Sequence, residues 1–176
     1  MQLISNNKTL VKTLTRLVNT YADISFAVAW ASANHEVFSL LKKHSSKISR
    51  AIIGTHFYQT HPDVLDYFQG SERVRFILQS EGVFHPKIYL FKSKYEWEAI
   101  IGSANLTAGA LGRNSEAVIL LGGKLDLANE IQIDLDGLIE MYWDEARSVD
   151  SHDVVAYREV WARKQPVIKR LSGQYG

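Results

Sequence analysis

Cysteine is absent from this chain of 176 residues, and proline (3 residues) and methionine (2 residues) are scarce. The lack of cysteine excludes disulfide bonds and thiolate metal sites, and it fits a reducing compartment. So few prolines leave no proline-rich linker between separate parts of the chain. No apolar run approaches the roughly 20 residues that span a bilayer, and the first residues carry no signal-peptide pattern. We therefore expect a single domain over residues 1–176, located in the cytoplasm and away from membranes.

Neither sign of charge dominates the sequence. Lysine and arginine number 20 against 19 aspartates and glutamates, which gives a net charge of +1. The hydrophobic share of 46% and the charged share of 22% are typical of a globular protein. Basic residues gather at 42–50, but such a cluster is most simply the solvated face of a helix. Net charge alone therefore identifies no partner.

Hydrophobic periodicity divides the chain into alternating helices and strands. Helices are expected at 7–20, 34–45, 60–68, from 124 onward and at about 152–172. Strands are expected at 23–30, 50–54, 73–78, 87–91, 98–102 and 116–121. Alternation in the first half followed by clustered strands predicts an α/β fold, with a mixed β-sheet flanked by helices on both faces.

Local signals set the expected ends of some elements. Thr60 is placed to cap the third helix, with Pro62 in its first turn. The glycine pair 122–123 is expected to end the last strand. Pro166 is expected to interrupt the last helix, because proline cannot donate the helical hydrogen bond.

Two pairs of polar residues carry the chemistry of the sequence. His85 and Lys87 are two positions apart, so on a strand they would point to the same face. Ser103 and Asn105 repeat this spacing just past Gly102, at the end of the next expected strand. A hairpin would bring the two pairs together. An imidazole, a fixed cation, a hydroxyl and an amide suit an anion, and a phosphate matches such a site in size and in its need for donors.

Glu116 begins the next expected strand, "EAVILL", where packing explains a carboxylate poorly. It would serve as the partner of an imidazole N–H, fixing the tautomer of the ring. Taken singly, each of these residues has an ordinary structural explanation as a core histidine, a solvated lysine, a turn or a strand-edge charge. Their occurrence together and in this order favours a functional site.

This combination resembles the signature of the phospholipase D superfamily, which is His-x-Lys followed by Gly-Ser-x-Asn. The longer stretch 84–121 is similar to the nuclease and restriction-endonuclease-like branch that carries a single such motif. The resemblance implies the α-β-α sandwich of that superfamily, here as one nuclease domain whose C-terminal helix packs on it or leads to a partner. The superfamily usually has an aspartate seven residues after the histidine, where this chain has Lys92. That departure weighs against an enzyme acting on lipids.

The resemblance also implies a two-step displacement that needs no metal or other cofactor. One histidine attacks phosphorus and forms a phosphohistidine, and a second protonates the leaving oxygen and then activates water. Lys87, Ser103 and Asn105 would hold the non-bridging oxygens, and Glu116 would orient His85. Because the chain has one motif and no internal repeat, we expect a homodimer with the site on its two-fold axis.

DNA is the expected substrate, with RNA as an alternative. His56, Lys92 and Arg113 are candidate substrate contacts. The grouping of His56 with His61 and Asp63 is interpreted as a loop at a strand end rather than as a metal site. Since nothing in the sequence encodes base readout, we expect non-specific cleavage by this domain. A larger complex that supplies a recognition module or a helicase is an open alternative. Two other functions stay open: a phospholipase or phosphatidyl transferase, and a non-catalytic nucleic-acid-binding subunit.

Overall fold

The computed structural model describes residues 1–78, 82–125 and 130–175. These residues build a seven-stranded sheet with the order β1-β7-β6-β5-β2-β3-β4. In chain order, the strands are β1 (Gln2–Ile4), β2 (Asp23–Val28), β3 (Ile48–Gly54), β4 (Val74–Ile77), β5 (Lys87–Lys92), β6 (Glu96–Gly102) and β7 (Val118–Lys124). Strand β2 is parallel to β3 on one side and antiparallel to β5 on the other, so the predicted mixed sheet is confirmed.

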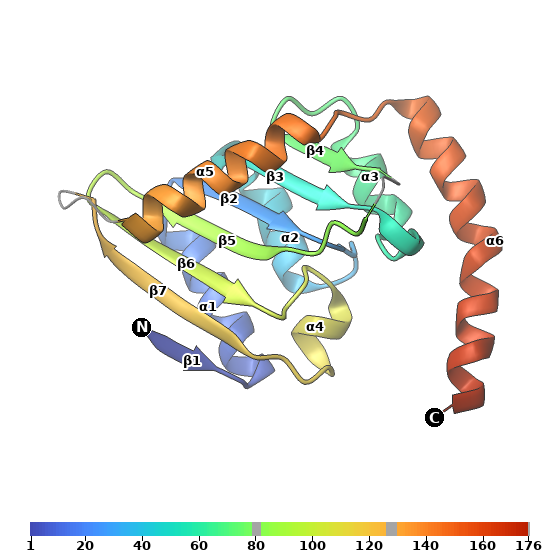
Figure 1. Cartoon of the computed structure of the whole chain (residues 1–176), viewed down its shortest axis with the longest axis horizontal. Coiled ribbons are helices and arrows are strands. Elements are labelled where there is room, and N and C mark those ends of the chain that lie inside the picture. Colours follow the sequence, from blue (N-terminus) through green and yellow to red (C-terminus); the bar gives the residue numbers. More distant parts are fainter. Residues whose placement is uncertain (79–81, 126–129, 176) are drawn as a thin grey trace.

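Helices cover both faces of the sheet, as Figure 1 shows. The helices are α1 (Asn7–Thr20), α2 (Glu36–Lys43), α3 (Pro62–Phe68), α4 (Ala108–Gly112), α5 (Glu130–Glu145) and α6 (Ser151–Tyr175), with the short turns η1 (Ser45–Lys47) and η2 (His56–Tyr58). Helix α5 lies across one face, and α1 and α2 lie against the other (Figure 1).

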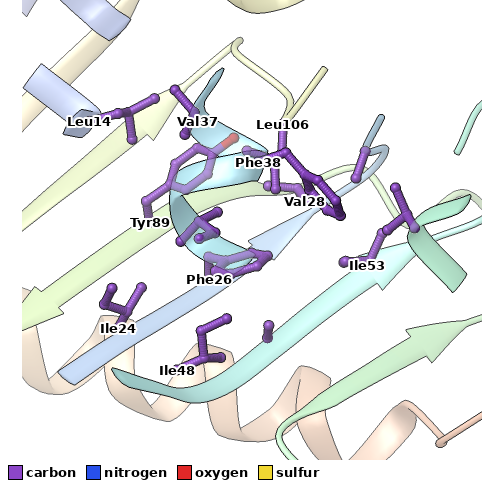
Figure 2. Close-up of a cluster of buried hydrophobic side chains, with 14 of the residues drawn as sticks. Leu14, Ile24, Phe26, Val28, Val37, Phe38, Ile48, Ile53, Tyr89 and Leu106 are labelled. Atoms are coloured by element: carbon purple, nitrogen blue, oxygen red, sulfur yellow. The ribbon is translucent and has the colours of Figure 1, made fainter. Parts of the chain in front are cut away.

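Side chains alternate between two cores along each strand, because successive residues of a strand point to opposite faces. Phe26 and Ile53 face the core under α1 and α2, whereas Ala27 and Ile52 face the core under α5. Figure 2 shows the first of these cores, where side chains of β2 and β3 meet Phe38 of α2. All four strand residues are at most 1% exposed. Their burial on both faces holds β2 and β3 firmly in the sheet.

Helix α6 packs on the sheet domain through α3 and η2. The hydroxyl of Tyr157 donates to the carbonyl oxygen of Thr60 at 2.8 Å, and the Arg158 guanidinium lies 3.0 Å from a carboxylate oxygen of Asp63. The helix continues through Pro166, contrary to our prediction. Pro166 is exposed, so water can satisfy the carbonyl that the missing N–H leaves open.

The remaining differences from the sequence-based expectations concern β7, α3, β1 and α5. Strand β7 continues through Gly122 and Gly123, and it begins two residues after Glu116. The side chain that caps α3 belongs to His61, while the Thr60 hydroxyl donates to the carbonyl oxygen of Gly54. Strand β1 was not predicted, because Ile4 is its one buried residue and three residues are too few for a pattern. The helix expected from 124 onward is seen from Glu130, and positions 126–129 lie outside the described residues.

Candidate active site

The expected site residues lie at one edge of the sheet. Lys87, the first residue of β5, pairs with Val28, the last residue of β2. Gly102, the last residue of β6, pairs with Val118, the first residue of β7. The segments that follow β2 and β6 therefore meet those that precede β5 and β7, on the side where the arrowheads of β2 and β6 end in Figure 1.

Trp30, two residues past β2, contacts three of the predicted catalytic residues. Its ring centroid lies 5.2 Å from that of His85 in an edge-to-face arrangement, and the Lys87 ammonium lies 5.7 Å from its ring centroid. Its backbone N–H donates to Oδ1 of Asn105 at 3.1 Å. This bond fixes the amide of Asn105 so that Nδ2 is the group that can donate to a ligand.

His85 and Lys87 share this neighbour but differ in exposure. Lys87 is 7% exposed and donates from Nζ to the backbone oxygen of His85 at 2.8 Å, whereas the His85 side chain is exposed. Burial lowers the pKa of the Lys87 ammonium, although the negative charge of Glu116 opposes this shift. Partial burial, and then the charge of Lys87, lower the pKa of the His85 imidazole below 6.5. At neutral pH the site thus presents an unprotonated imidazole beside a partly desolvated cation.

Ser103 and Glu116 form a second group at the same edge. The Ser103 hydroxyl donates to Oε2 of Glu116 and accepts the N–H of Ala117 at 2.9 Å. Asn114 donates to the other carboxylate oxygen at 3.4 Å. In the described part of the chain, no hydrogen bond joins Glu116 to His85, so the expected orientation of the imidazole by Glu116 stays a prediction.

The turn that carries Ser103 and Asn105 is held from beneath. Tyr89, fully buried on β5, donates its hydroxyl to the carbonyl oxygen of Ala104 at 3.1 Å, and its pKa is raised by burial and by the charge of Glu116. Gly102 permits the close approach of β7, because a Cβ there would lie 2.4 Å from the carbonyl oxygen of Ala117. The positions of the turn and of Glu116 are therefore coupled.

His35 holds the other end of this turn. Its Nδ1 accepts the N–H of Phe38 at the start of α2, so Nε2 carries the hydrogen and donates to the carbonyl oxygen of Leu106 at 3.3 Å. Burial lowers the pKa of His35, which keeps the ring in this neutral form. Neither Trp30 nor Tyr89 nor His35 was singled out from the sequence. Trp30 ends the buried run "AVAW", and an aromatic residue just past a buried strand was the available signal.

The three predicted substrate contacts differ in where the structure places them and in how exposed they are. Arg113 is exposed at the end of α4, three residues before Glu116. His56 follows β3 at the site edge, but the residue is only 3% exposed, and its carbonyl oxygen accepts the Trp30 indole N–H at 3.1 Å. Lys92 is at the opposite end of β5, where its ammonium lies 2.7 Å from Asp136, so the structure does not bring it to the site.

A groove of about 580 Å³ opens beside His85 on the α5 face of the sheet. Its lining includes Phe84, Tyr142 and Glu145, and the rings of Phe84 and Tyr142 meet edge to face with centroids 5.1 Å apart. The groove opens onto the exposed imidazole, and its wall includes these two rings.

Within the described ranges, no group of three histidine, aspartate or glutamate side chains is arranged to hold a metal ion. Among the described helices, none combines the length and the apolar composition needed to cross a membrane.

Comparison with known proteins gives one family match in sequence. Residues 58–139 match the family described as "Cardiolipin synthase, PLD-like domain", a segment that contains His85, Lys87, Ser103, Asn105 and Glu116. No curated protein matches the chain in sequence.

Several solved structures share the fold at low sequence identity. NucT from Helicobacter pylori superimposes with a TM-score of 0.61 at 14% identity, over 84% of this chain and 97% of that protein. Nuc from Salmonella typhimurium, a phospholipase D family member, superimposes with a TM-score of 0.61 at 14% identity, over 85% of this chain and 97% of that protein. TrmBL2, an archaeal chromatin protein described with a novel mode of DNA binding, has a TM-score of 0.54 at 10% identity, over 84% of this chain and 52% of that protein. The family match over the site residues and the shared fold confirm the resemblance seen in the sequence: the chain contains a phospholipase D-like domain.

Proposed function

We propose that this protein is a metal-independent phosphodiesterase that cleaves DNA through a phosphohistidine. The observation that carries the proposal is the placement of an exposed imidazole next to a buried ammonium at one edge of the sheet. The lowered pKa of His85 favours the unprotonated ring that a nucleophile requires. Lys87 supplies a positive charge whose desolvation cost an anionic phosphate would offset.

The reaction takes two steps. A ring nitrogen of His85 forms a bond to phosphorus while the bond to the leaving oxygen breaks, and that oxygen takes a proton from a second histidine. Water then attacks phosphorus, the nitrogen–phosphorus bond breaks, and the second histidine accepts the proton of the water. Lys87 and Nδ2 of Asn105 hold the non-bridging oxygens. Ser103 joins them when its hydroxyl turns from Glu116 to the substrate.

The second histidine would come from another copy of the chain. The sequence contains one His-x-Lys motif, and His85 is exposed at the sheet edge. Two copies meeting across a two-fold axis would place two His85 rings on opposite sides of one phosphate. The negative charge of the bound phosphate would favour a proton on one ring, which acts as the acid, while the other ring stays neutral as the nucleophile. Because Glu116 bonds to Ser103 in the single chain, we assign its support of the imidazole to the assembled dimer.

Cleavage in the absence of metal tests the proposal directly. The purified protein should cut single- or double-stranded DNA in EDTA, and His85→Ala should abolish cutting. His152→Ala is the matched control, since His152 is exposed on α6 outside the site edge and its loss should leave cleavage intact. Cutting that survives in His85→Ala, or that appears only with a divalent cation, would contradict the mechanism.

Mixing tests the dimer. Excess His85→Ala protein added to wild-type protein, under conditions that exchange subunits, should lower the activity per wild-type chain, because mixed dimers hold one histidine. Unchanged activity would contradict a shared site.

A lipid substrate is the second candidate, and the family description that names a cardiolipin synthase favours it. Turnover of phosphatidylglycerol vesicles that is lost in His85→Ala, with no cutting of DNA, would move the assignment to phosphatidyl transfer.

A further inference from the structure

The turn η2 after β3 has an unusual backbone. Phe57 and Tyr58 are consecutive non-glycine residues with positive φ, at 59° and 55°. Bulky residues rarely adopt this left-handed conformation, because the side chain crowds the backbone. Such conformations persist where the surrounding structure enforces them, and they concentrate at ligand-binding sites.

Neighbouring elements hold the turn at both ends. The N–H and the hydroxyl of Thr55 both donate to the carbonyl oxygen of Ile77, at 3.0 and 3.1 Å. The carbonyl oxygen of Tyr58 accepts the side-chain amide of Gln165 at 3.1 Å, and its ring lies 5.5 Å from that of Tyr157. Strand β4 and helix α6 thus impose the strained conformation.

The turn presents one aromatic ring to solvent. Phe57 is 56% exposed, while His56 next to it is 3% exposed. A single exposed phenylalanine is common on protein surfaces. A phenylalanine that a strained and anchored backbone keeps outside the core is preorganised for a ligand.

Trp30 connects this ring to the candidate active site. Strands β2 and β3 are parallel, so both end at the site edge. The Trp30 indole N–H donates to the carbonyl oxygen of His56 at 3.1 Å, while the same indole meets the His85 ring at 5.2 Å. Phe57 therefore comes directly after His56 in the chain, and Trp30 links His56 to His85, the proposed nucleophile.

We infer that Phe57 is a stacking platform for an unpaired nucleobase of the substrate, next to the phosphate at His85. The inference rests on the proposed function and narrows it to nucleic acid with accessible base faces, either single-stranded or locally opened. Every base has a flat π face that stacks on an aromatic ring without regard to sequence. A phosphatidyl headgroup has no such face, and paired bases in a duplex cover theirs.

Binding to intact and abasic oligonucleotides tests the platform. All proteins carry His85→Ala, so that the probe is not consumed, and fluorescence anisotropy reports binding of a labelled oligodeoxyadenylate or of an abasic strand of equal length. Phe57→Ala should weaken binding of the oligodeoxyadenylate by about tenfold and leave the abasic strand unchanged. Phe57→Trp should restore the affinity.

Two further variants separate stacking from folding and from general aromatic contact. Phe57→Gly removes the ring and relieves the left-handed strain, so it should lose the same affinity without losing thermal stability. Tyr95→Ala is the matched control, because Tyr95 is 71% exposed in the hairpin between β5 and β6 at the opposite edge of the sheet, and it should bind both strands normally.

Equal affinity of Phe57→Ala and its parent for the oligodeoxyadenylate would overturn the inference, as would an equal loss for both strands. A loss confined to anionic phospholipid vesicles would overturn it in favour of membrane insertion by Phe57. A base-dependent loss in a protein whose wild-type form cuts no DNA would support the platform while defeating the proposed function.

Discussion

Strand β5 carries a lysine at each end, and the two lysines have opposite surroundings. Lys87 at the site edge is 7% exposed and donates to a backbone oxygen, and among the residues that the structure describes it forms no ion pair. Lys92 at the other edge lies 2.7 Å from Asp136 and 3.7 Å from Asp23. The charge of Lys92 is therefore balanced by two carboxylates, whereas no carboxylate pairs with the charge of Lys87 among the described residues.

The difference separates a structural lysine from a candidate functional one. A charge paired with carboxylates ties elements together, here β5 to β2 and α5. A charge that is buried next to an aromatic ring without such a pair costs folding free energy, which an anionic ligand can offset. The two residues therefore form a matched pair for experiment, on one strand and with one chemistry.

Activity should separate the two lysines most strongly. Lys87→Met should lower kcat/KM for phosphodiester hydrolysis in EDTA by about 10²- to 10³-fold, because a fixed charge on the phosphate oxygens is lost. Lys92→Met should stay within about twofold of wild type, since it acts on no reacting atom. Equal losses in both variants would show that general electrostatics, rather than position, matters.

Thermal stability should show the reverse order, with the larger loss in the Lys92 variant. Lys92→Met should lower the free energy of unfolding by about 1 kcal/mol, which is about 2–4 °C in Tm for a chain of this size. Lys87→Met should not lower Tm, because methionine fills the site without the desolvation of a charge. Differential scanning calorimetry at neutral pH measures both, and a larger loss in Lys87→Met would contradict the assignment of its charge to a ligand.

The smallest expected effect is on the titration of His85. The charge of Lys87 disfavours the imidazolium, so Lys87→Met should raise the pKa of His85 towards its ordinary value. The acid limb of the kcat/KM profile would then move to higher pH, because the neutral ring is the nucleophile. Histidine NMR titration, assigned with His85→Ala, gives the value, and Lys92→Met should leave it unchanged.

Much of the fold was predictable because long amphipathic segments dominate it. Helix α1 has the predicted bounds, and strands β2 to β6 overlap their predicted ranges. The failures occurred where short-range patterns compete with tertiary contacts. Gly122 and Gly123 remain in strand β7 because β6 supplies their partners, Glu98 and Trp97.

The candidate site was predictable in its residues and less so in its contacts. The spacing of His85, Lys87, Ser103 and Asn105 marks them in the sequence, and the structure brings them to one edge. The sequence could not show that Trp30 links them, because its role depends on the order of β3, β2 and β5 in the sheet. The sequence also could not show that Lys92 pairs with Asp23 and Asp136, because those partners come from β2 and α5. Lys92 was therefore predicted to contact phosphate, although it lies at the opposite end of β5 from Lys87.

The pairing of β1 with β7 has a consequence for how the protein folds. Ile4 pairs with Val118, more than a hundred positions later in the chain, and β7 also sets the position of Glu116 against the turn after β6. Contacts of such long sequence separation form late and slow the folding rate. We expect the edge that carries the candidate site to be among the last parts to assemble, so that partly folded chains should lack any activity of that site.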